Sequence, residues 1–134
     1  MDSSNKHKHL DYIQDTIQRM ASNSSRIKEC GFALVVAIFG LQKAGIMKIS
    51  SCVIMLLVFL WALDAYYLAL ERQYRRLYDY VRLKDNKLID YSMDISTFKR
   101  KKDNIMRVMV TSKSLCLVYI PFVLSLAIYK RIGG

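Results

Sequence analysis

The chain has 134 residues, of which 53% are hydrophobic and 24% charged, and its formal net charge is +10. The length fits one domain, but the apolar residues are gathered in three blocks between charged segments, which favours a membrane protein over a soluble one. Because basic residues flank membrane spans, we attribute the positive charge to lipid contact and expect no direct nucleic-acid binding.

Residues 1–29 are polar, and from Leu10 they carry a helical pattern. Leu10, Ile13, Ile17 and Met20 recur at spacings of three, four and three, which places them on one face of a helix. The segment is amphipathic and too polar to span a bilayer. We predict an N-terminal cytosolic helix that packs on the protein itself; binding to a partner or to the membrane surface stays an alternative.

Residues 30–47 form the first apolar block, and we predict that they are transmembrane helix 1. The block reaches 18 residues only by including Gln42 and Lys43, so a full crossing and a re-entrant segment both stay open. A stripe of small residues follows one face and would let another helix approach closely. Its members are Ala33, Ala37, Gly40 and Ala44.

Residues 51–70 are predicted to form transmembrane helix 2, with Asp64 as the single charge between Cys52 and Leu70. This length suffices to cross the hydrocarbon core. No Gly or Pro interrupts the sequence as far as Arg82, so we expect the helix to continue unbroken into the cytosol.

Residues 71–107 should form a basic cytosolic segment, because they hold eleven Lys or Arg against six Asp or Glu. Alternating apolar and polar residues from 89 to 96 indicate an extended or strand-like stretch, and a new helix should begin near Asn104. The basic residues are expected to anchor lipid headgroups or to bind a phosphate-bearing ligand. They are Arg72, Arg75, Arg76, Lys99, Arg100, Lys101 and Lys102.

Residues 108–129 are predicted to be transmembrane helix 3, with Lys113 and Pro121 inside it. The N-terminus and the 71–107 segment together hold sixteen Lys or Arg, against four in the first hairpin and at the C-terminus. By the positive-inside rule, the N-terminus and the long loop should be cytosolic and the C-terminus outside.

Two charges of opposite sign lie at matching depth in the predicted spans. Asp64 and Lys113 are each about 9–10 Å from the cytosolic edge, counted at about 1.5 Å per residue, and an unpaired charge there would cost on the order of 3 kcal/mol. We predict that the two form an ion pair, within or between protomers. Alternatively, Asp64, Tyr67, Glu71 and Arg75 share one helical face and line a pore mouth in an oligomer.

Motifs for catalysis are absent from the sequence. It contains no GxSxG, GxxxxGK[ST] or HExxH pattern, and its histidines lie far from its cysteines. We therefore expect no enzyme activity, no metal site and no cofactor. Cys30, Cys52 and Cys116 are interpreted as small buried hydrophobes. The tyrosines near the cytosolic edge suit an interfacial aromatic belt, or a surface for a nucleotide.

Three segments carry a resemblance: IQDTIQRMASNSSRIK at 13–28, LWALDAYYLALERQYRRLYDYVR at 60–82 and YSMDISTFKRKKDN at 91–104. Together they resemble an uncharacterised family of small bacterial inner-membrane proteins with three spans. The chain departs from that pattern at Ser25 and at Cys30-Gly31. The matching residues are Arg19, Met20, Asn23, Ser24, Asp64, Tyr66, Tyr67, Glu71, Arg72, Ser92 and Met93.

The resemblance implies a location in the bacterial inner membrane, and small polytopic proteins of this kind suggest a role by analogy. The leading hypothesis is a homo-oligomeric, membrane-disrupting or pore-forming effector of anti-phage defence, gated from the cytosol by a protein or a nucleotide-type signal. The alternative is a non-conducting scaffold or regulatory subunit that recruits a soluble partner.

Overall fold

The computed structural model describes residues 2–45 and 51–132, and within these ranges the chain is helical with irregular connections and no strand. This part agrees with the all-α prediction. The helices are α1 (Asp2–Lys43), α2 (Ser51–Leu83), α3 (Ile105–Thr111) and α4 (Lys113–Ile132). Short 3-10 turns at Asn86–Leu88, Ser96–Phe98 and Lys101–Asp103 lie between α2 and α3.

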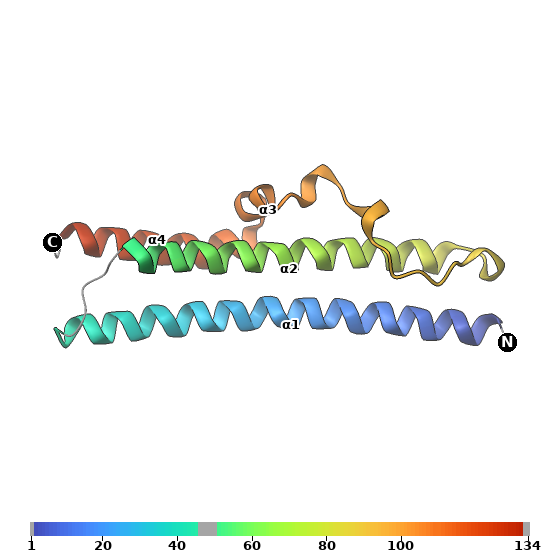
Figure 1. Ribbon diagram of the computed structural model, residues 1–134, viewed down its shortest axis with the longest axis horizontal. Coiled ribbons are helices and arrows are strands. Elements are labelled where there is room, and N and C mark those ends of the chain that lie inside the picture. The colour runs from blue at the N-terminus through green and yellow to red at the C-terminus, as the bar shows by residue number, and fades with distance from the viewer. Residues whose placement is uncertain (1, 46–50, 133–134) are drawn as a thin grey trace.

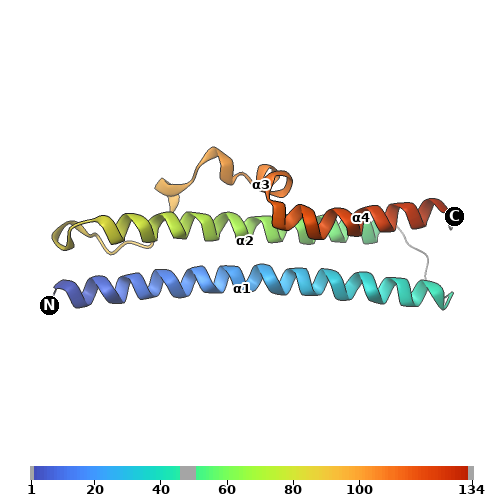
Figure 2. The ribbon, with the colours of Figure 1, turned by 180° about the vertical axis from the view of Figure 1, so that it is seen from behind.

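The long helices lie side by side along one axis (Figures 1 and 2). α1 and α2 run antiparallel over most of their length, and α4 lies beside α2 at the end away from the N-terminus. The connection after α2 returns along that helix, and α3 lies across its direction. The two chain ends therefore stand at opposite ends of the molecule.

α1 is one continuous helix of 42 residues, so no break separates the predicted amphipathic helix from the first apolar block. No proline interrupts the segment. The helix ends where Gly45 adopts a φ of +72° and donates its backbone N–H to the Gln42 carbonyl oxygen at 3.0 Å. Glycine adopts this left-handed conformation without steric cost and commonly terminates helices.

α2 confirms the expectation of an unbroken helix, because it continues from Ser51 through the apolar block to Leu83. Its polar half packs on the first half of α1. There Ile13, Leu77 and Val81 are buried, with Leu10 and Ile17 packed against them. The N-terminal part of α1 thus packs on the protein itself. Burying each of the larger side chains contributes about 2 kcal/mol to the free energy of folding.

The segment from 89 to 95 is irregular and contains no strand. Ile89 is extended at φ −81° and ψ 126°, but Tyr91 has a φ of +53° and Ile95 has φ −101° and ψ 0°, so the strand-like interpretation is only partly right. Local side-chain bonds hold its shape instead: the backbone N–H of Asp94 donates to the Ser92 hydroxyl oxygen at 3.1 Å, and that of Ser96 to Asp94 Oδ1 at 2.8 Å. Ile89 and Ile95 pack onto the α1–α2 cluster.

The predicted third span, 108–129, is divided. α3 begins after Asn104, as expected, and the Asn104 side chain caps it by accepting the backbone N–H of Met106 at 3.3 Å. At Ser112 the backbone turns to φ −78° and ψ 113°, which ends α3 before α4 starts at Lys113. α4 continues through Pro121 to Ile132.

Two helices are long and apolar enough to cross a membrane: Val53–Leu83 and Lys113–Ile132. α1 does not reach this standard, because polar residues as far as Glu29 precede an apolar stretch whose described helical part ends at Lys43. Three crossings are therefore not shown, and residues 46–50 of the first hairpin lie outside the described ranges.

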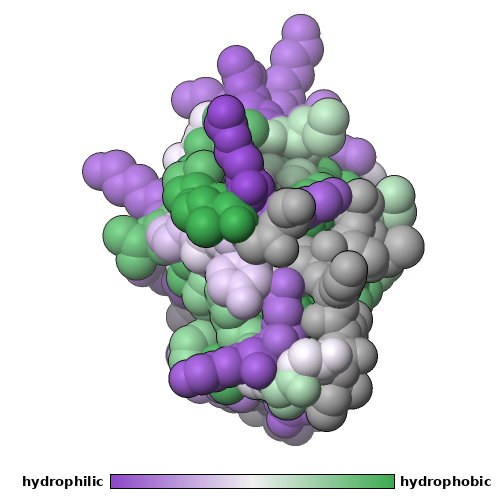
Figure 3. Space-filling view, turned by 90° about the vertical axis from the view of Figure 1, so that its left-hand side faces the viewer, coloured by the Kyte–Doolittle hydropathy of each residue, from purple (hydrophilic) through white to green (hydrophobic). Residues whose placement is uncertain are grey.

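The end of the bundle at which α1 finishes and α2 begins carries a mixed surface. Figure 3 shows hydrophilic side chains projecting around hydrophobic ones on this face. Lys43 occupies the last turn of α1, and Lys130 and Arg131 occupy the last turn of α4. Basic side chains at helix ends can reach the headgroup layer while their stems stay in lipid.

Candidate functional site

A buried polar cluster joins the three long helices, and we call it the Asp64 centre. Asp64 on α2 is fully buried, and Ser24 and Lys28 face it from successive turns of α1. Lys28 Nζ lies 2.8 Å from Asp64 Oδ2 and 3.0 Å from Oδ1. The Ser24 hydroxyl donates to Oδ1 and accepts from Lys28 Nζ at 2.7 Å. The carboxylate therefore binds α1 to α2 at two points.

Tyr119 of α4 completes the Asp64 centre. Its ring is fully buried and stacks on Trp61, with 5.9 Å between the ring centroids and 8° between their planes. A Cβ on Gly31 would lie 3.7 Å from this ring, which is an ordinary contact distance, so α1 and α4 pack against each other at this point. Among the described residues, the Tyr119 hydroxyl is buried without a hydrogen bond, and it lies near the carboxylate. Tyr119 is thus a further donor beside a carboxylate that Ser24 and Lys28 already contact.

The chemistry of the Asp64 centre is that of a charge-neutral junction. A lysine and a carboxylate in contact neutralise each other, and removing one of a buried pair leaves an uncompensated charge. No group of three His, Cys, Asp or Glu side chains in residues 2–45 and 51–132 could hold a metal ion. The arrangement can couple the positions of α1, α2 and α4 to one another.

The predicted pair between Asp64 and Lys113 is wrong for the single chain. Lys113 is exposed at the start of α4, while Lys28 fills the position beside the carboxylate. Sequence reasoning missed Lys28 because it assigned residues 1–29 to the cytosol. The sequence does contain a sign of this contact: Ser24 and Lys28 are four residues apart, so they share the face of α1 opposite Arg26.

The predicted pore-lining face behaves differently at its two ends. Asp64 faces α1 and has no exposed surface. Farther along, Glu71 pairs with Arg75 on the helix surface, with 2.7 Å between Oε1 and Nη2, and Tyr67 is half-buried beside the exposed Tyr66. On this face Asp64 is therefore buried, Tyr67 and Glu71 are half-buried, and Arg75 is exposed.

Arg76, predicted to bind a headgroup or phosphate, instead holds the connecting loop. Its guanidinium donates to Asp103 Oδ1 at 2.9 Å and to the Phe98 carbonyl oxygen at 2.8 Å. The backbone N–H of Arg100 also donates to Asp103, at 2.9 Å. The hydrogen bonds from Arg76 are the main cause that lowers the pKa of the Asp103 carboxyl.

Besides Arg76 and Arg75, which pairs with Glu71, the predicted basic residues stay available to a ligand. Arg72 is half-buried, and Lys99, Arg100, Lys101 and Lys102 are exposed. An open depression of about 760 Å³ runs along the Lys99–Lys101 stretch and is shared with Ser96, Asp103, Asn104 and Ile105. Anionic groups can reach these side chains.

The small-residue stripe faces away from the rest of the chain. Val35 and Ile38 supply the buried face of α1 at this end, whereas Ala33, Ala37, Gly40 and Ala44 are exposed. The stripe therefore mediates no helix packing within one chain. Cys30 is exposed too, contrary to its interpretation as a buried hydrophobe, and Cys116 is half-buried.

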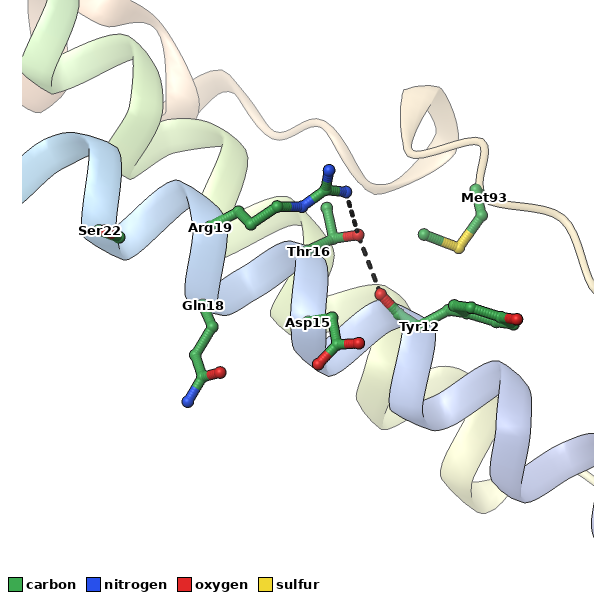
Figure 4. A pocket seen from close by; sticks show the side chains of 7 residues that line it. All are labelled: Tyr12, Asp15, Thr16, Gln18, Arg19, Ser22 and Met93. Atoms are coloured by element: carbon green, nitrogen blue, oxygen red, sulfur yellow. Dashed lines mark hydrogen bonds between the residues drawn. The ribbon is translucent and has the colours of Figure 1, made fainter.

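An open groove on the polar half of α1, which sequence reasoning did not identify, faces Met93 in the connection after α2 (Figure 4). Its volume is about 840 Å³. Arg19 Nη2 donates to Thr16 Oγ1 at 3.3 Å, and Thr16 donates to the Tyr12 carbonyl oxygen at 2.9 Å. The lining residues are Tyr12, Asp15, Thr16, Gln18, Arg19, Ser22 and Met93.

Comparison of the chain with protein-family models, curated proteins and solved structures gave no match.

Proposed function

We propose that the chain is a small homo-oligomeric protein of the bacterial inner membrane that permeabilises the bilayer when a cytosolic signal acts on it. The N-terminus and the loop between α2 and α3 are cytosolic, and the C-terminus lies outside. The distribution of basic residues supports this orientation, and the resemblance to small three-span proteins supports a setting in anti-phage defence.

The observation that carries the proposal is the continuity of α1 and α2. Each is a single helix that extends from the polar end of the hairpin to its apolar end. At about 1.5 Å per residue, α1 is about 63 Å long, about twice the thickness of the hydrocarbon core. A displacement of the cytosolic end therefore moves the membrane end directly.

In this proposal the Asp64 centre holds the helices together in the closed state, before the signal arrives. The two contacts between Lys28 and Asp64 hold α1 against α2 where the hairpin passes from polar to apolar packing. A signal that rotates or separates the polar halves must break them. Freed from α2, the apolar part of α1 can rearrange between subunits and open a path for ions.

Membrane potential in expressing cells tests the proposal. Lys28→Met leaves Asp64 without its counter-ion, so this variant should depolarise cells without any trigger, whereas the wild type should need one. Lys87→Met is the matched control, because Lys87 is exposed in the cytosolic loop, and it should behave like the wild type. An unchanged potential with Lys28→Met present in the membrane at wild-type levels would contradict a conducting role.

A second function, a membrane scaffold that recruits a soluble partner, is favoured by the groove at Tyr12, Asp15, Thr16 and Arg19 (Figure 4). The groove presents both charges and an aromatic ring to the cytosol. If it is the functional surface, Arg19→Glu should abolish capture of one stoichiometric partner while membrane potential stays normal in all variants.

A further inference from the structure

The hairpin register shows which parts of α1 and α2 share one level. Lys28 contacts Asp64 directly, and Val35 and Ile38 pack in one cluster with Leu57 and Val53. The part of α1 from Lys28 to Ile38 therefore lies beside the part of α2 from Asp64 back to Val53, inside the segment that is apolar enough to cross a membrane.

The two candidate spans agree on where the membrane begins. The apolar block of α2 ends at Leu70, before Glu71 and Arg72. α4 starts at Lys113, and its Leu115 packs in one cluster with Ala65 and Ala69, so both helices reach the cytosolic boundary at the same level. Asp64 is six residues from Leu70, which is about 9 Å inside that boundary.

Charged side chains of α1 consequently lie at membrane depth. Arg26 is two residues before Lys28, and Glu29 is one residue after it, so both stand near the level of Asp64. Unlike Lys28, both are exposed, and neither belongs to an ion pair within the described part of the chain. A charge that faces lipid at this depth is costly unless it is paired.

These two residues share a face with the small residues of the same helix, and we call this the outer face of α1. At a helical period of 3.6 residues, positions separated by three, four or seven residues align. The outer face consists of Arg26, Glu29, Cys30, Ala33, Ala37 and Gly40, all of them exposed. At one end it therefore carries charges that have no partner in the described part of the chain, and at the other end it carries small residues that let a second helix approach closely.

We propose that the outer face of α1 binds the outer face of a second copy of this chain. Copies inserted in one membrane are parallel, so their Arg26 and Glu29 residues stand at the same levels, separated along the helix by three residues, about 4.5 Å. Arg26 of one copy can therefore pair with Glu29 of the other. The small residues then let the apolar parts of the two helices meet without bulky side chains between them.

The proposal rests on the membrane placement in the proposed function but not on conduction. Cys30 is a native probe, since it lies on the outer face and is exposed. In a full-length chain that keeps Cys30 and carries Cys52→Ser and Cys116→Ser, copper-phenanthroline oxidation in isolated membranes should give a covalent dimer. The matched control adds Cys30→Ser and Phe32→Cys, which moves the thiol to another exposed face of α1, and should give at least tenfold less dimer.

Charge exchange tests the pairing in the same Cys30 background. Arg26→Glu and Glu29→Arg should each reduce the dimer at least fivefold, and the double exchange should restore it. Equal crosslinking at positions 30 and 32, indifference to both single reversals, or a monomeric mass in mild detergent would overturn the proposal. Crosslinking with an unchanged membrane potential would support this interface and contradict the proposed pore; depolarisation without crosslinking would do the reverse.

Discussion

At the scale of single residues, the contact between Lys28 and Asp64 ties α1 to α2 through a fully buried carboxylate. Asp64 is fully buried, whereas Lys28 keeps about a quarter of its side chain exposed, so the carboxylate is the partner that cannot regain water if the contact is lost. Losing one member of a buried pair is more costly than losing both, because the remaining charge stays desolvated.

This asymmetry gives a prediction. Lys28→Met should destabilise the protein by about 3–5 kcal/mol, whereas Lys28→Met combined with Asp64→Leu should cost much less than the sum of the two single changes. The double-mutant cycle compares the free energies of unfolding of the wild type, the two single variants and the double variant, each measured in a mixed detergent series. Additive losses would mean that the two side chains do not interact.

At the scale of helices and loops, the sequence predicts elements better than their partners. The unbroken α2 follows from the absence of Gly and Pro between Ser51 and Arg82, and the start of α3 follows from Asn104. The sequence does not predict the partner of Asp64, because depth in the membrane is counted separately along each predicted span. Lys28 precedes the apolar block of α1, whereas Asp64 lies well inside the apolar block of α2. Only the register of the α1–α2 hairpin shows that the two are neighbours.

The loop after α2 also shows that the sequence does not reveal which side chains contact each other. The charge of Arg76 suggested a ligand, yet its partner, Asp103, lies 27 residues away in the chain. In the same way, His9 lies in the polar stretch before Leu10, but its ring is buried against Tyr91, with 5.5 Å between the ring centroids and 76° between their planes. Tyr91 itself has a φ of +53°, which a spacing pattern does not reveal.

The contact between His9 and the loop should depend on pH. Burial lowers the pKa of His9 below its ordinary value of 6.5, although the charge of Asp90 opposes the shift. The unfolded segment therefore binds a proton more readily than the folded one, and stability of this contact is lost as the pH falls from about 6.5 towards the folded pKa. Hydrogen exchange of residues 89–95, corrected for intrinsic rates, should become faster below pH 6.5. His9→Phe should remove this dependence; its persistence in that variant would assign the effect to another group.

At the scale of the whole molecule, the alternating directions of α1, α2 and α4 separate the two chain ends (Figure 1). Three crossings place these ends on opposite sides of the membrane, whereas crossings by α2 and α4 alone place them on the same side. The apolar part of α1 packs with α2 and α4 through Val35, Ile38 and Leu126, and exclusion from the bilayer would require breaking that cluster. We therefore expect all three helices to insert together.

Reporter fusions decide between these arrangements. An N-terminal fusion to a fluorescent protein that folds only in the cytosol should be bright, and a C-terminal alkaline phosphatase, active only outside, should be active. The reciprocal fusions should be silent. In this topology α1 carries Arg26 and Glu29 to the level of Asp64, and this placement is the basis of the proposed contact with a second copy. If both ends report the cytosol, α1 stays out of the bilayer, its charges meet water, and the reason for an interface on the outer face of α1 disappears.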